Sequence, residues 1–256
     1  MGTSQSSPGP GGNSPLVPPW AEDPSDQPGF PPLPPPEPTR FKGFRQSLGK
    51  FIATGERNNL ESALGHYARK GTGGAAGASR RMGSITKAGG SLYGALSTGG
   101  TFGAPGNESI SLNDLAGLPC DMAVAAISQA LTPDGGDADK IRVAMNHALV
   151  EALDGVEIFD PESITDDVIV DTMICYLAES IFLQIVMDSS KAWNKADTTA
   201  QAVTAENDLR ELIKVVVDQH MAPKLAGQVR SLSSSDFVRI EKQVIEEVWT
   251  EWEAYQ

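Results

Sequence analysis

The α-amino group of Gly2 is the group in this chain best suited to attack an activated acyl carbon. Gly2 is a small residue directly after Met1, so we expect Met1 to be removed and the glycine amine to be exposed. The pKa of an α-amino group is about 8, so on the order of a tenth of it is neutral at pH 7, whereas a lysine is almost fully charged. Because residues 1–12 carry no charge, we expect this amine to be an acyl acceptor.

Two other modifications or chemistries compete with that interpretation. Gly2 with Ser6 fits the permissive N-myristoylation pattern, which would make the protein lipid-anchored in a host that acylates proteins. The stretch 71–76 loosely fits a dinucleotide-binding pattern, but a predicted helix precedes it where a strand is required. We favour neither alternative.

Residue spacing gives no support for a catalytic or metal site. The three histidines lack a Cys, Asp or Glu at ligand spacing, and the aspartates at 134, 137 and 139 lack the length and the terminal glutamate of a calcium loop. No phosphate-binding P-loop is present. We therefore expect a protein that is not an enzyme and that binds no cofactor or metal.

A proline-rich arm, residues 1–39, places Gly2 far from the remainder of the chain. It holds 13 of the 18 prolines and 5 glycines. Prolines lack the N–H that helices and sheets require, so we expect this arm to be disordered and extended. Fully stretched, it would reach about 120 Å. Trp20 is the exception, because an indole in such an arm is expected to pack on a partner surface.

Charge divides the chain into three blocks that sum to a net −13. Residues 1–39 carry −4, residues 40–95 carry +8, and residues 96–256 carry −17. The basic block predicts contact with an acidic protein surface. An alternative is a nucleic-acid site with Tyr67 and Tyr93 among the cations, although the acidic whole opposes such an encounter. The predicted partner-binding cations are Arg69, Lys70, Arg80 and Arg81.

Hydrophobic periodicity predicts an all-α fold, a helical bundle preceded by the disordered arm. We divide it into a basic, glycine-rich helical segment 40–96, a linker 97–110 and an acidic helical bundle 111–256. Gly55 and Gly71 are expected to end the first two helices, and Asn58 or Asn59 to cap the second. Later helices are expected near 111–117, 120–131, 138–154, 163–194, 197–221 and 235–255.

Two predicted details bear on stability. The helix through Met82 and Leu96 contains several glycines, each costing about 1 kcal/mol relative to alanine, so it is expected to be ordered only when something packs on its small face. In the last helix we expect Glu241 to face water. Pro223 is expected to mark a helix break.

Cysteine usage and hydropathy predict the cellular compartment. Cys120 and Cys175 stand far apart, which favours a reducing cytoplasm over a disulfide framework. The N-terminus lacks the basic and apolar regions of a signal peptide. The apolar run 164–187 contains four carboxylates, which predicts a buried helix and no contact with a membrane.

Several motifs resemble those of a known family. The B component (QatB-like) of the Qat bacterial anti-phage defence system has similar motifs. The similar residues are 1–4, 6–7 and 9–11, the segment 16–20, and a basic run from Arg40 that includes 65–67, 69–71, 80–83 and 92–96. The resemblance covers about the first hundred residues. Beyond Ser97 the chain shares the general all-helical character.

This resemblance implies a non-enzymatic defence component that works beside three others. These are an ATPase, a TatD-like nuclease, and a QueC-like enzyme, a homologue of the queuosine-pathway enzyme that makes 7-cyano-7-deazaguanine. It implies that Gly2 attacks an acyl-adenylate and becomes an amide-linked deazaguanine conjugate, while Thr3 and Ser4 line the partner's entrance. The alternative is an adaptor whose basic helices bring the nuclease to phage DNA.

Overall fold

The computed structural model describes residues 10–11, 14–21, 33 and 35–255, and it confirms the all-α prediction. In this part of the chain, β-type pairing is limited to two isolated bridges, Phe102 with Ile110 and Pro119 with Ile158. The chain forms two compact units. Unit 1 comprises Met1–Gly83, Ile181–Val216 and Ile245–Gln256, and unit 2 comprises Ser84–Ser180 and Val217–Val244.

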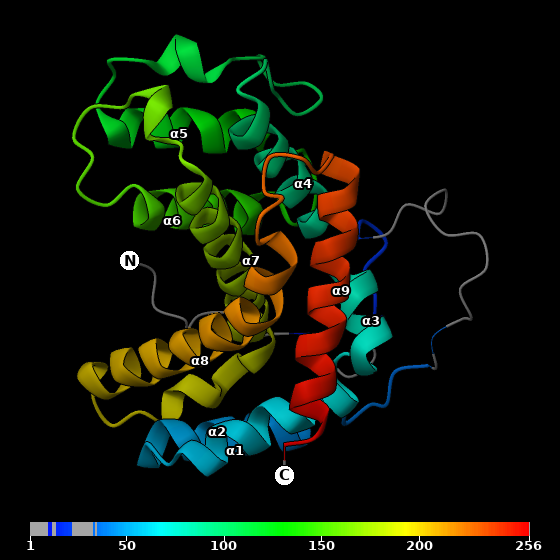
Figure 1. The fold of residues 1–256 in the computed structure, drawn as a ribbon. Helices are drawn as coiled ribbons and strands as arrows, with labels where there is room; N and C mark the ends of the chain where they lie inside the picture. The colour runs from blue at the N-terminus through cyan, green and yellow to red at the C-terminus, as the bar shows by residue number, and fades with distance from the viewer. Residues whose placement is uncertain (1–9, 12–13, 22–32, 34, 256) are drawn as a thin grey trace. The chain divides into compact units, whose positions relative to one another are not determined.

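Figure 1 shows the described helices in their order along the chain, and the longest connection between α-helices, residues 99–119, joins α4 to α5. The α-helices are α1 (Lys42–Thr54), α2 (Arg57–His66), α3 (Gly74–Arg81), α4 (Gly83–Thr98), α5 (Cys120–Leu131), α6 (Ala138–Ala152), α7 (Asp166–Ser189), α8 (Thr199–Leu225) and α9 (Ser234–Glu253). A π-helix, η3 (Tyr67–Gly71), extends α2, and the 3-10 helices are η4 (Leu112–Leu115), η5 (Pro161–Ser163) and η6 (Ser190–Lys195).

Helix boundaries agree with the sequence where a glycine supplies the signal. Gly55 ends α1 in the left-handed conformation, with φ of 70°, as a C-terminal glycine should. The cap of α2 was predicted wrongly, because the residue before its first turn is Glu56. The break at Pro223 is also wrong, since α8 continues to Leu225. A proline this close to a helix end disturbs little more than the final turn.

Unit 1 is built around aromatic side chains. α1 and α2 pack side by side (Figure 1), and the buried ring of Tyr67 lies 4.8 Å from Phe44 and 6.2 Å from Trp249, measured between ring centroids. The indole N–H of Trp249 donates to the Thr72 hydroxyl over 2.8 Å. A buried indole N–H is stabilised by such an acceptor, so this bond helps to fix where α9 meets the segment after η3.

Unit 2 explains why a helix so rich in glycine is stable. The first part of α9 packs on the glycine face of α4, where a Cβ on Gly90 would lie 2.5 Å from a methyl of Val238. A Cβ on Gly94 would come equally close to the Ser234 hydroxyl. The stacked rings of Tyr93 and Phe237, 4.5 Å apart, complete this contact. The sequence predicted that this helix needs close packing on its glycine face, and the contact between α4 and α9 confirms it.

The position of Glu241, in the same contact between α4 and α9, differs from the prediction. Its side chain is completely buried against Gly89, and neither carboxylate oxygen has a hydrogen-bond partner in the part of the chain that the structure describes. Burial raises the pKa of Glu241 well above its ordinary value. The expectation that Glu241 faces water was wrong, because the buried stripe of α9 is wider than the five apolar residues that suggested it.

Among the described helices, one stretch is long and apolar enough to cross a membrane by length and composition, Asp166–Lys195. Of its most apolar window, 78% is buried. Core helices of globular proteins share these properties, and the buried share agrees with the predicted buried helix.

Candidate functional site

A buried ion pair joins α3 to the end of α7 inside unit 1. Nη2 of Arg81 donates to both carboxylate oxygens of Asp188, over 3.0 and 3.1 Å, and the hydroxyl of Tyr67 donates to Oδ2 over 2.7 Å. All three side chains are buried. Burial and the neighbouring carboxylate raise the pKa of Tyr67 well above its ordinary value, so the phenol remains a donor.

Two further arginines lie beside this pair. Arg40 is 1% exposed, and burial followed by repulsion from Arg81 lowers its pKa. The Nε atom of Arg45 donates to the backbone carbonyl of Asp188 over 3.0 Å. Three guanidinium groups therefore share one carboxylate, which leaves an excess of positive charge and of N–H donors in the interior of unit 1.

Backbone carbonyls of the arm supply acceptors for these arginines. Arg81 donates to the carbonyl of Leu16 over 3.2 Å, Arg45 donates to that of Pro10 over 3.0 Å, and Arg40 lies at the distance limit from that of Pro15, 3.4 Å. Even so, Nε and Nη1 of Arg40 have no hydrogen-bond partner in the described part of the chain. We call the three arginines and the arm carbonyls above them the arm seat.

The arm seat is shaped by two glycines as well as by charge. A Cβ on Gly73 would lie 2.9 Å from a methyl of Leu16, and one on Gly83 would lie 2.2 Å from the carbonyl oxygen of Ala21. Leu16 and Ala21 are themselves buried, at 6% and 2% exposure. The described residues 14–21 of the arm thus pack on unit 1, a contact that proline content gave no reason to expect.

The predicted site residues fall into different environments. Gly2, Thr3 and Ser4 lie outside the described residues, so their predicted role stays a prediction. The indole of Trp20 is 54% exposed on the seated part of the arm, where it is available to a partner. Lys70 is exposed and Arg80 is half-buried.

Two of the predicted cations have intramolecular roles. Arg69, although exposed, donates through Nη1 to the carbonyls of Glu253 and Tyr255 and so fastens the end of α9. The assignment of Arg81 to a partner surface was wrong, because this residue is 7% exposed and its guanidinium is engaged with Asp188. Sequence reasoning missed Asp188, Arg40 and Arg45. The available signal was a carboxylate at the end of an apolar helix, which requires a cation when buried.

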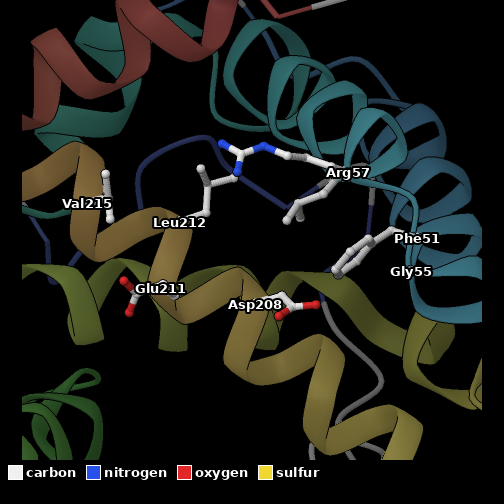
Figure 2. A pocket seen from close by; sticks show the side chains of 8 residues that line it. Phe51, Gly55, Arg57, Asp208, Glu211, Leu212 and Val215 are labelled. Atoms are coloured by element: carbon white, nitrogen blue, oxygen red, sulfur yellow. The ribbon is translucent and has the colours of Figure 1, made fainter.

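A small pocket opens elsewhere in unit 1 and has a different character (Figure 2). It measures about 260 Å³ and has an apolar floor that includes Phe51, Leu60 and Leu212. The carboxylates of Asp208 and Glu211 project from α8 (Figure 2). Arg57, on the opposite side, is paired with Glu61 at 3.0 Å. Apolar side chains dominate, so the pocket suits an apolar group better than acid–base chemistry.

Within the residues that the structure describes, no group of three His, Cys, Asp or Glu side chains could hold a metal ion. His66 lies against α1, where its ring atoms are 2.9 Å from the position of a Cβ on Gly43. Burial, then repulsion from Arg69 and Lys70, lowers the pKa of His66. These features describe a histidine used for packing.

Comparison with protein families decides the relationship of the chain. A family model described as "Qat anti-phage system associated protein QatB" matches residues 73–252, which is 180 of the 256 residues. The chain belongs to the QatB family. It is therefore a protein associated with the Qat anti-phage system, as the N-terminal motifs suggested. Comparisons with curated proteins and with solved structures returned no match.

The QatB match covers residues beyond the first hundred, where the sequence motifs ended. It spans most of the helical body past Ser97, where the sequence motifs gave general character alone. It includes Arg81 and Asp188, while Arg40, Arg45 and the arm lie before its first residue.

Proposed function

We propose that this QatB-family chain is a non-enzymatic, cytoplasmic component of the Qat defence system. It binds a QueC-like enzyme and presents the amine of Gly2 as the substrate for conjugation to a deazaguanine. Family membership supports the defence role, and the unhindered, uncharged flank of Gly2 supports the chemistry. The ATPase and the TatD-like nuclease of the same system are further partners in this proposal.

The conjugation is an acyl transfer. The neutral Gly2 amine attacks the carbonyl carbon of a deazaguanine acyl-adenylate that the partner makes from ATP. The bond from that carbon to the phosphate oxygen breaks, AMP leaves, and the nitrogen loses a proton as the amide forms. No oxidant or metal is required from this chain.

The arm seat is the observation that carries the proposal furthest. Pro10 is held by Arg45, and Gly2 lies eight residues before it. At roughly 3.3–3.6 Å per residue, the amine then reaches at most about 29 Å from Pro10. A 39-residue arm free along its whole length would reach about 120 Å. The short tether between Gly2 and Pro10 raises the effective concentration of the Gly2 amine at a partner bound beside unit 1.

Intact-mass spectrometry and peptide mapping test the proposal. The chain is purified after co-expression with the QueC-like enzyme, and we expect one deazaguanine acyl group on the Gly2 peptide and none when that enzyme is omitted. A Gln5→Ala variant, at a residue outside the predicted partner-binding set, is the matched control and should be modified normally. An unmodified Gly2 in the co-expressed protein, or full defence by a Gly2→Asp variant, would overturn the proposal.

The alternative role as a nucleic-acid adaptor finds less support in this geometry. Arg40 and Arg81, two of the ten cations in the basic block, are buried in the arm seat and unavailable to phosphates. Unit 2 has 18 acidic and 7 basic residues, a net −11, which opposes a long polyanion.

A further inference from the structure

An open basic pocket lies between α1 and η6 in unit 1. Its volume is about 650 Å³, within the range of small-molecule sites. The residues that line it are Arg45, Gln46, Gly49, Lys50, Ala53, Ser190, Lys191, Ala192 and Lys195. The pocket is separate from the apolar pocket of Figure 2, which shares none of these residues.

The charge of this pocket is unlike that of the chain as a whole. Four cations and no carboxylate line it, in a protein with net charge −13. Lys50, Lys191 and Lys195 are exposed, and none forms an ion pair within the part of the chain that the structure describes. Like charges gathered around one hollow repel each other, so an anion in the hollow would be favoured.

Backbone features gather these cations. A Cβ on Gly49 would lie 3.2 Å from Cγ of Lys195, so the glycine leaves room for the stem of that lysine to lie over α1. Ser190 has φ of 55° and is the one described non-glycine residue with positive φ. Such strained positions concentrate at binding sites. Ser190 is the first residue of η6, which also carries Lys191 and Lys195.

We propose that this pocket binds an oligophosphate group with three or more negative charges. Lys50, Lys191 and Lys195 match that charge, and phosphate oxygens accept hydrogen bonds from lysine. Arg45 adds a fourth positive charge at the edge of the pocket while it donates to the carbonyls of Asp188 and Pro10. Small side chains at Gly49, Ala53 and Ala192 leave a smooth floor with room for the remainder of a ligand. The pocket has room for a compact anion, and the net charge of −13 on the whole chain opposes the approach of a long polyanion.

Two sources supply this chemistry, a nucleoside triphosphate and inorganic oligophosphate. Isothermal titration calorimetry on the full chain distinguishes them with ATP, inorganic tripolyphosphate and AMP as probes. We expect ATP or tripolyphosphate to bind with a Kd on the order of 10 µM at low salt, and AMP to bind at least about tenfold more weakly. Tighter binding of ATP than of tripolyphosphate identifies a nucleotide, and the reverse order identifies inorganic oligophosphate.

Charge reversal locates the site. Lys50→Glu combined with Lys195→Glu should weaken binding by at least about tenfold, because two of four cations become anions. Lys42→Glu combined with Lys70→Glu alters net charge equally at exposed positions outside the pocket, and should leave the affinity within about threefold. These exposed substitutions are not expected to affect folding, which circular dichroism checks. Equal losses in the two double variants, or no binding of either oligophosphate at 1 mM, would refute the site.

A short single-stranded DNA supplies the final comparison. If it binds more tightly than both oligophosphates, and loses as much affinity with the Lys42 and Lys70 changes as with the Lys50 and Lys195 changes, the ligand is nucleic acid on a diffuse surface. That result also overturns the proposed pocket. None of these measurements depends on modification of Gly2. They therefore test the pocket independently of the conjugation proposal.

Discussion

Arg81 and Asp188 are 107 residues apart in the sequence, yet one guanidinium nitrogen of Arg81 lies within 3.1 Å of both carboxylate oxygens of Asp188. This contact ties α3 to α7 within unit 1. The same Arg81 side chain donates to Leu16 of the arm. Core stability and arm position thus depend on one side chain.

Removal of the shared carboxylate should destabilise the protein strongly. Asp188→Asn leaves Arg81 and Arg40 buried beside each other without a countercharge, so we expect the free energy of unfolding to fall by about 3–5 kcal/mol. Urea denaturation measures it. Asp197→Asn, at an exposed position, should change the value by less than about 0.5 kcal/mol. A loss below 1 kcal/mol for Asp188→Asn would contradict the compensating role of the carboxylate.

The arm should leave its seat when Gly83 gains a side chain. In Gly83→Ala the new Cβ would lie 2.2 Å from the Ala21 carbonyl, so the arm segment must move. We expect proteinase K to cleave residues 14–21 several-fold faster than in the parent chain, as mapped by mass spectrometry. Gly100→Ala, whose nearest neighbour is 3.5 Å away, is the matched control. Equal cleavage rates in the two variants would argue against the seat.

Glu241 should make stability fall as pH rises. Its pKa is raised by burial, so the folded state keeps a proton that the unfolded chain releases above about pH 4.3. The free energy of unfolding should therefore decline above that pH, until the pH passes the folded-state pKa. Glu241→Gln should remove this decline and gain about 1–3 kcal/mol at pH 7, while changing little at pH 4.

Chemical denaturation at pH 4, 5.5 and 7 tests this dependence. Glu246→Gln, at an exposed position of the same helix, should follow the parent chain at all three pH values. The buried-carboxyl interpretation fails if Glu241→Gln declines with pH as steeply as that control.

Alanine substitutions of Arg69 and of the adjacent Lys70 should distinguish a residue that stabilises the fold from one that is free to bind a partner. Arg69→Ala removes the hydrogen bonds to the carbonyls of Glu253 and Tyr255, so we expect faster amide hydrogen exchange in the last turn of α9 and a loss of about 1 kcal/mol. Lys70→Ala should alter neither quantity. If both variants exchange alike, Arg69 does not fasten this turn.

Local signals in the sequence account for much of the fold. Gly55 ends α1, and the spacing of Phe237, Val244, Val248 and Trp252 marks the buried side of α9. Both depend on neighbours within a few residues, which sequence patterns record. Glu241 escaped the same pattern because its burial depends on the space left by Gly89, a residue 152 positions earlier in the chain.

The arm seat required three-dimensional information for a related reason. Arg40, Arg45 and Arg81 lie on separate elements, and no spacing rule connects them to Asp188. Net charge placed Arg81 with the surface cations, although a buried carboxylate 107 residues later holds it in the interior. The proposed role of the Gly2 amine rests on the sequence alone, because Gly2 lies outside the described residues.

The arm seat should tolerate some substitutions in the arm better than deletions. Its arginines contact main-chain oxygens, which every residue type carries, and a proline brings that oxygen without an N–H that would need its own partner. Substitutions at Pro10 or Pro15 should therefore retain the attachment. A one-residue deletion between these positions would move the Pro10 carbonyl about 3.3–3.6 Å out of register with the carbonyls of Pro15 and Leu16. The arginine contacts thus depend on the spacing of the arm carbonyls more than on residue type, whereas Leu16 also contributes a buried side chain.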